Sequence, residues 1–98
     1  MKRFFASEYS LVQATGVLTT EMGSEKVIMH PVSGEIWWLN RTASAIWACF
    51  AVPASPREAV STLLDRFEID AETCRSEVGE VCDRAIAGGF LVPVGDPA

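Results

Sequence analysis

Basic residues are scarce in this chain. Of its 98 residues, eight are Lys or Arg and 13 are Asp or Glu, which gives a formal net charge of −5 at pH 7. Binding to a phosphate backbone or to an anionic membrane requires a basic face, so this charge disfavours nucleic acid and membrane surfaces as partners. The chain also lacks a run of about 18 apolar residues, so it predicts no membrane span.

Paired cysteines and metal-ligand spacings are missing as well. Cys49, Cys74 and Cys82 form an odd set without a CxxC motif. A small secreted domain is expected to carry even numbers of closely spaced cysteines, so we expect buried, reduced thiols here. His30 is the only histidine, and no two of these four residues have metal-ligand spacing. We therefore predict no metal site, and we interpret His30 as an ordinary turn residue.

The sequence shows no catalytic constellation and no cofactor-binding motif. Gly88-Gly89 follows a predicted helix, whereas a phosphate-binding loop precedes one. The carboxylates of Asp65, Glu68 and Asp70 could in principle do acid–base chemistry, but capping a helix and facing solvent is the simpler interpretation. We predict that the protein is not an enzyme and that it has no cofactor.

The N-terminus begins as a signal peptide does, with Lys2 and Arg3 followed by apolar residues. Glu8 and Tyr9 then interrupt the apolar stretch, so we expect a cytoplasmic protein. The length fits one domain. We expect it to span residues 1–98, with roughly the first ten and the last six residues loose.

The first half of the chain reads as β-structure. Short apolar and β-branched stretches alternate with Gly- and Pro-containing turns, which predicts an antiparallel meander. A short strand or extended arm over 10–15 precedes it. The three predicted strands cover residues 17–22, 25–30 and 35–39.

The second half reads as three helices with start signals. The first covers 41–50 after a cap at Asn40 or Thr42, and the second covers 56–67 after a capping box at Ser55 and Glu58. Asp70 is expected to cap the third, which Gly88-Gly89 end. Residues 90–92 form an apolar extended tail. The predicted fold class is α+β, winged-helix-like, with a three-stranded sheet followed by three helices.

Two adjacent tryptophans in the third strand must face opposite sides of the sheet, because side chains alternate along a strand. We assign Trp37 and Leu39 to the core together with Trp47, and Ile36 and Trp38 to the other side. Glu35 is the only charge on this strand, so its edge is suited to accept a peptide as an additional strand. Two simpler interpretations stay open: the strand lies in the middle of the sheet, or a dimer partner covers it.

A segment around these tryptophans resembles a known family. The pattern Gly34…Trp37-Trp38-Leu39-Asn40-Arg41-Thr42-Ala43…Ile46-Trp47 resembles the strand-to-helix signature of the PqqD-like family, the RiPP recognition elements. The likeness extends over about residues 15–92 and is strongest to the small stand-alone leader-binding proteins of lasso-peptide gene clusters. Ile36 stands where an aromatic is common, and Cys82 and Ala85 replace larger aliphatics.

This resemblance implies a non-enzymatic adaptor. It would bind the leader segment of a ribosomally synthesised precursor peptide by strand addition and present it to a leader peptidase, which resembles transglutaminases, and to a macrocyclase. The resemblance is also compatible with a homodimer when no peptide is bound. The resemblance assigns backbone pairing with the leader to Glu35, Ile36, Trp37 and Trp38, and adds Leu39 at the end of the strand to the peptide-binding positions. The helix wall of the groove would consist of Val78, Val81, Cys82 and Ala85, and Arg75 would pair with an acidic residue of the leader.

Two alternatives remain at this level. One is a PqqD-like chaperone for another peptide-modifying enzyme, such as a radical-SAM enzyme. The other is a winged-helix DNA-binding regulator that reads DNA with the third helix. Acids that face phosphates disfavour DNA reading. The charged residues of that helix are Glu72, Arg75, Glu77, Glu80, Asp83 and Arg84.

Overall fold

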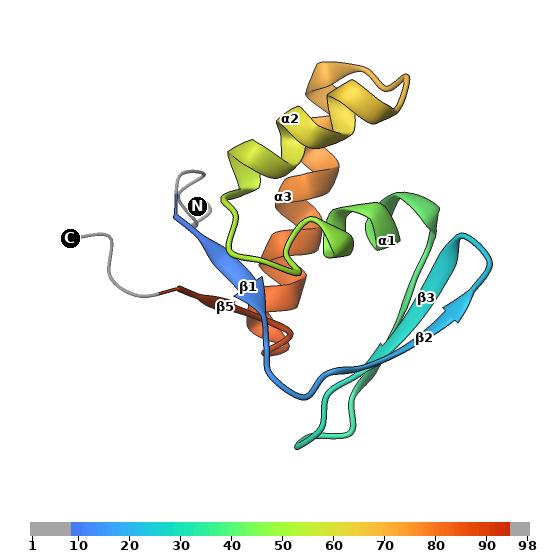
Figure 1. Ribbon diagram of the computed structural model, residues 1–98, viewed down its shortest axis with the longest axis vertical. Coiled ribbons are helices and arrows are strands. Elements are labelled where there is room, and N and C mark those ends of the chain that lie inside the picture. The colour runs from blue at the N-terminus through green and yellow to red at the C-terminus, as the bar shows by residue number, and fades with distance from the viewer. Residues whose placement is uncertain (1–8, 95–98) are drawn as a thin grey trace.

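The computed structural model describes residues 9–94, which form an α+β fold (Figure 1). The α+β class and the order of three meander strands followed by three helices are confirmed. In chain order the elements are β1 (Leu11–Gln13), β2 (Leu18–Met22), β3 (Glu25–Met29), β4 (Ile36–Leu39), α1 (Arg41–Ala48), α2 (Pro56–Arg66), α3 (Ala71–Ala87) and β5 (Leu91–Pro93).

Two separate sheets make up the β-structure. The larger sheet has the order β2-β3-β4 with antiparallel pairing throughout, as the predicted meander requires. The smaller sheet joins the two ends of the described chain, because β1 pairs with β5 in antiparallel register and Val12 lies opposite Val92. Sequence reasoning expected extended structure at both places but not their pairing, which depends on the tertiary fold.

The predicted helix start signals are all used. Asn40, rather than Thr42, caps α1 by accepting a hydrogen bond from the Ala43 amide at 2.8 Å. Ser55 and Glu58 form the predicted capping box of α2. Asp70 accepts from the Thr73 amide at 3.1 Å and caps α3. These bonds satisfy amide groups that a helix start otherwise leaves without partners.

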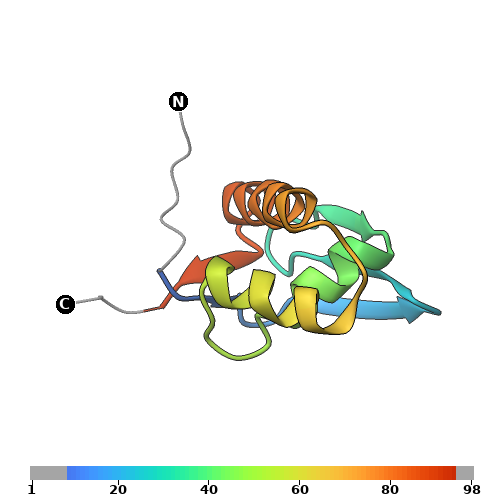
Figure 2. The ribbon, with the colours of Figure 1, turned by 90° about the horizontal axis from the view of Figure 1, so that it is seen from above.

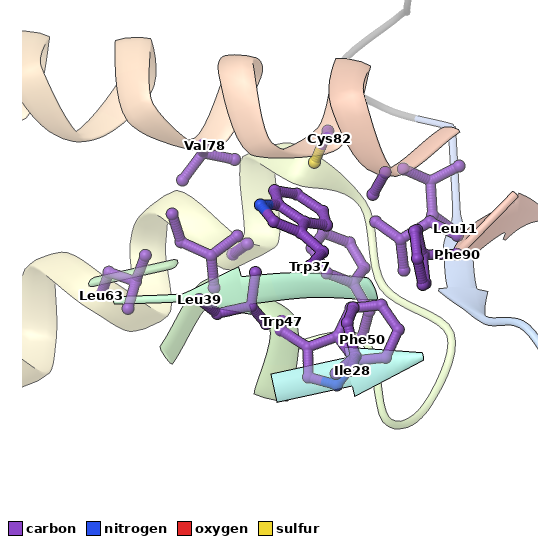
Figure 3. Packing of buried hydrophobic residues seen from close by; sticks show 14 of the residues in the cluster. Leu11, Ile28, Trp37, Leu39, Trp47, Phe50, Leu63, Val78, Cys82 and Phe90 are labelled. Atoms are coloured by element: carbon purple, nitrogen blue, oxygen red, sulfur yellow. The ribbon is translucent and has the colours of Figure 1, made fainter. Parts of the chain in front are cut away.

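The core lies between the helices and one face of the larger sheet (Figures 2 and 3). Ile28, Trp37 and Leu39 point from the sheet into this layer and are at most 8% exposed. Trp47 from α1 packs with them, so the assignment of Trp37, Leu39 and Trp47 to the core is confirmed. Phe90, directly before β5, lies edge-on to Trp47 with ring centroids 6.5 Å apart.

His30 stabilises the turn between β3 and β4. Its Nδ1 accepts hydrogen bonds from the Val32 amide at 3.1 Å and from the Ser33 amide at 3.3 Å. Its ring lies edge-on to Phe90, with centroids 5.7 Å apart. These contacts confirm its interpretation as a turn residue.

All three cysteines are free thiols. Cys74 and Cys82 are buried, and Cys49 is partly buried. Burial raises the pKa of each thiol, because a thiolate would lose its hydration. For Cys82, burial and, to a lesser extent, the neighbouring Asp83 carboxylate raise the pKa to about 12.

Most of the terminal residues that were expected to be loose lie outside the described part of the chain. At its margins the chain is held in place, because the Ser10 carbonyl accepts a hydrogen bond from the Val94 amide at 3.0 Å. Among the helices of residues 9–94, none has both the length and the hydropathy of a membrane span.

Candidate functional site

Strand β4 forms an edge of the larger sheet. It pairs with β3 on one side, and no strand of residues 9–94 pairs with its other side. The interpretation of this segment as a middle strand is therefore wrong for the described chain. An unpaired edge leaves backbone donors and acceptors available to another strand.

The backbone groups that point away from β3 belong to two residues. His30 donates its amide to the Glu35 carbonyl at 2.9 Å, which fixes the alternation of hydrogen-bonded pairs along the ladder. In an antiparallel pair the N–H and C=O groups of alternate residues point to the partner and away from it. Trp37 and Leu39 consequently pair with β3, whereas the backbone groups of Ile36 and Trp38 face the open edge. The prediction that Glu35 and Trp37 also supply backbone pairing does not fit this alternation.

The side chains of Ile36 and Trp38 lie on the outer face of the sheet. They are 64% and 59% exposed, so the predicted alternation is confirmed. The Trp38 indole nitrogen donates a hydrogen bond of 2.8 Å to a carboxylate oxygen of Glu25 on the neighbouring strand. This bond holds a large exposed aromatic side chain in a defined orientation next to the open edge.

Trp37 connects β4 to helix α3. Its ring centroid is 5.9 Å from that of Phe90, and the guanidinium carbon of Arg84 lies 4.6 Å above the Trp37 ring. A guanidinium over an aromatic face is attracted by the electrons of the ring. Arg84 thus covers Trp37 from the solvent side at the point where α3 approaches the edge strand.

A groove of about 270 Å³ separates β4 from α3. Its walls combine an aromatic ring, aliphatic groups and charges of both signs. The lining residues are Trp37, Asn40, Ala43, Glu77, Glu80, Val81 and Arg84. A strand added beside β4 would place every second side chain on this side of the sheet.

The structure places the predicted residues of α3 in three different environments. Val81 is partly exposed and lines the groove. Val78, Cys82 and Ala85 are at most 1% exposed and pack into the core. Figure 3 shows Val78 and Cys82 there together with Leu39 from β4. Arg75 lies in another groove, between α2 and α3. Of the predicted α3 residues, only Val81 therefore has its side chain beside the open edge.

Sequence reasoning missed several groove residues, namely Asn40, Ala43, Glu77, Glu80 and Arg84. Residues 77, 80, 81 and 84 follow the three-to-four spacing of one helix face, so this face could have been recognised as a unit. Its position opposite β4 depends on how α3 crosses the sheet, which the spacing does not encode.

The fold and this edge define a class of protein: a small winged-helix-like α+β domain with an open edge strand beside a helix groove. The chain belongs to the PqqD family. The family model described as "Coenzyme PQQ synthesis protein D (PqqD)" matches residues 25–91, about two thirds of the sequence. The match begins at the first residue of β3 and ends in β5, so it includes β4, all three helices and the groove.

Two solved structures share this fold. One, described as "TbiB1 in Complex with the TbiA(beta) Leader Peptide", has a TM-score of 0.74 and 19% sequence identity, and the match covers 87% of this chain and 99% of that chain. The other, "Lasso peptide synthetase B1 complexed with the leader peptide", has a TM-score of 0.70 at 19% identity, covering 85% and 98%. Comparison with curated protein sequences gives no match.

Proposed function

We propose that this protein is a non-enzymatic adaptor that binds the leader segment of a ribosomally synthesised precursor peptide. The leader adds a strand to the open side of β4 and places alternate side chains in the groove below α3. Membership of the PqqD family supports this function. The two structures of the same fold, both described as leader-peptide complexes, support it further and favour lasso-peptide biosynthesis as the pathway.

The observation that carries the proposal is the open backbone of Ile36 and Trp38 next to a groove. The two residues offer two N–H donors and two C=O acceptors to a guest strand. Each hydrogen bond contributes about 0.5–1.5 kcal/mol net, which alone gives weak affinity once the guest has been ordered. Side chains buried in the groove must supply the remainder, and burial of apolar surface contributes about 25 cal/mol per Å².

The DNA-binding alternative has less support. Glu77 and Glu80 lie on the groove side of α3, and Glu72 lies in its first turn. These carboxylates would face the phosphates if α3 entered a DNA groove. The net charge of −5 opposes the same contact.

An adaptor of this kind acts through other proteins. We propose that the bound precursor is handed to a leader peptidase of the transglutaminase-like type and to a macrocyclase, in the cytoplasm. We propose that Ile36 and Trp38 pair with the backbone of the leader. Trp37, Val81 and Arg84 contact those side chains of the leader that enter the groove. In the absence of the leader, two copies of the protein would pair through the open edge of β4 to form a homodimer.

The test is a titration of a fluorescently labelled leader segment from the candidate precursor against the natural protein and two proline variants. Ile36→Pro removes an N–H that faces the guest, and the proline ring blocks its approach. Thr19→Pro is the matched control, because Thr19 has the equivalent outward-facing position on β2, at the opposite edge of the sheet. We expect at least a roughly tenfold loss of affinity for Ile36→Pro and no change for Thr19→Pro.

Circular dichroism and thermal unfolding of both variants separate a binding effect from loss of the fold. Equal affinities of a folded Ile36→Pro variant and the natural protein would refute strand addition at β4. Tight binding to duplex DNA that falls steeply with salt would support the regulator instead.

A further inference from the structure

A second groove lies on the opposite flank of α3, between α2 and α3. Its volume is about 510 Å³, larger than the 270 Å³ groove beside β4. The two helices touch at its base, where the Cys74 sulfur lies 3.9 Å from the Val60 carbonyl oxygen. The lining residues are Pro56, Arg57, Val60, Ser61, Leu64, Arg75, Val78 and Gly79.

The floor of this groove contains a glycine that the fold does not require. Gly79 lies in the interior of α3 and has no positive φ, and a β-carbon added there would meet no atom of a neighbouring segment within 4 Å. Glycine inside a helix destabilises it relative to alanine. Neither close packing nor a special backbone conformation therefore requires glycine at this position. Without a side chain, Gly79 leaves the groove deep enough for another backbone to approach closely.

Two arginines flank the apolar part of the groove. Arg57 lies in the first turn of α2 and Arg75 near the start of α3, and both are exposed. Because only residues 67–70 connect the two helices, Arg75 lies near the joined end of the groove and Arg57 near the far end. Between them lie Val60 and Leu64, of which Leu64 is 37% exposed. The rim is therefore positive in a protein whose net charge is negative.

We propose that this groove binds an acidic amphipathic helix of a partner protein. The apolar stripe of that helix covers Val60 and Leu64 over the gap left by Gly79, and carboxylates on its sides pair with Arg57 and Arg75. Binding of a helix in an apolar groove is a common mode of recognition. Ion pairs with the two arginines, one near each end of the groove, would fix the position of the bound helix. The chain's own residues 1–8 fit this rim less well, since Lys2 and Arg3 carry the same charge as the arginines.

The proposed helix site is separate from the proposed leader site. Residues 75, 78 and 79 lie on one flank of α3 and residues 77, 80, 81 and 84 on the other, because each residue advances by about 100° around a helix. A leader on β4 and a helix between α2 and α3 can therefore be bound at the same time. This inference does not depend on strand addition at β4.

The probe is a synthetic amphipathic peptide with a leucine stripe and a glutamate on each side of it, two helical turns apart. A second peptide has lysine in place of both glutamates. Each is titrated into the isotope-labelled full chain, and backbone amide shifts are followed by NMR. We expect the acidic peptide to shift the amides of Val60, Ser61, Leu64 and Gly79, and the lysine peptide to bind at least roughly tenfold more weakly.

Variants locate the contact. Arg57→Glu and Arg75→Glu should each weaken the acidic peptide roughly tenfold. Lys26→Glu on β3 makes the same change in net charge away from this groove and should leave the affinity for the acidic peptide within about twofold. Gly79→Gln fills the groove without breaking the helix and should abolish binding. No binding, equal binding of both peptides, shifts centred on β4, or full binding by a folded Gly79→Gln variant would each overturn the proposal.

Discussion

The two open edges of the larger sheet differ in what lies beside them. On β2, Thr19 and Glu21 direct their backbone groups outward, and all five residues of the strand are exposed. On β4, Ile36 and Trp38 do the same, but the residues between and after them are buried beneath α1 and α3. Both edges can form hydrogen bonds with a guest, and β4 in addition borders a groove with a helix wall. The two edges thus offer similar backbone groups but different side-chain surroundings, and the proposed function assigns the selectivity of β4 to the helix beside it.

The largest expected effect comes from two residues that share one row of the sheet, Trp37 on β4 and Thr19 on β2, both opposite Ile28. Trp37→Ala should lower the free energy of unfolding by about 3–5 kcal/mol, because it empties a packed position between Phe90 and Arg84. Thr19→Ala should change it by less than about 0.5 kcal/mol. Urea unfolding of both variants checks this. Similar losses at the two positions would mean that the edges are equally covered.

The next effect is the loss of stability at alkaline pH that follows from the burial of the Cys82 thiol in α3. Burial raises the pKa of Cys82 to about 12 from a reference value of 9.0, so the folded state favours the neutral thiol. Its contribution to stability is complete below pH 9 and is lost as the pH rises from 9 toward 12, by up to about 1.4 kcal/mol per pH unit.

The measurement for Cys82 is urea unfolding from pH 8 to 11, a range that starts below the reference pKa of 9.0. Cys82→Ala should remove part of the alkaline loss of stability, whereas the same substitution at the partly buried Cys49 should remove less. An identical pH profile for the natural protein and Cys82→Ala would show that burial in the core does not hold this thiol neutral.

A smaller effect distinguishes the two flanks of α3. Arg84 stacks on Trp37, whereas Arg75 lies in the α2–α3 groove. Arg84→Ala should reduce the free energy of unfolding by about 0.5–1 kcal/mol through loss of the cation–π contact at an exposed position. Arg75→Ala should change it by less than about 0.5 kcal/mol. Thermal unfolding at matched pH compares the two variants. A larger loss of stability for Arg75→Ala than for Arg84→Ala would contradict the assignment of the stabilising arginine to the β4 flank of α3.

Much of the fold was predictable because its signals are local. Asn40, Ser55 and Asp70 cap their helices within three residues of their own positions. The alternation at Trp37 and Trp38 follows from strand geometry and needs no knowledge of the tertiary fold. The pairing of β1 with β5 was not predictable in this way, since it joins residues about 80 positions apart.

The site was predictable only in part, for the same physical reason. The edge strand was identified from its composition, and the exposure of Ile36 and Trp38 from their parity. Which flank of α3 faces β4 depends on the helix crossing, so Arg75 was expected at the edge where Arg84 lies. Val78 and Cys82 have the apolar character of a groove wall, but the same character places them in the core.

Amide hydrogen exchange at the two sheet edges tests the central claim most directly. In the free protein, the amides of Ile36 and Trp38 on β4 and of Thr19 and Glu21 on β2 should all exchange rapidly, because none is bonded within the sheet. With the leader peptide bound, Ile36 and Trp38 should become protected, while Thr19 and Glu21 should remain unchanged. Protection of the β2 pair, or rapid exchange of Ile36 and Trp38 in a saturated complex, would contradict the account.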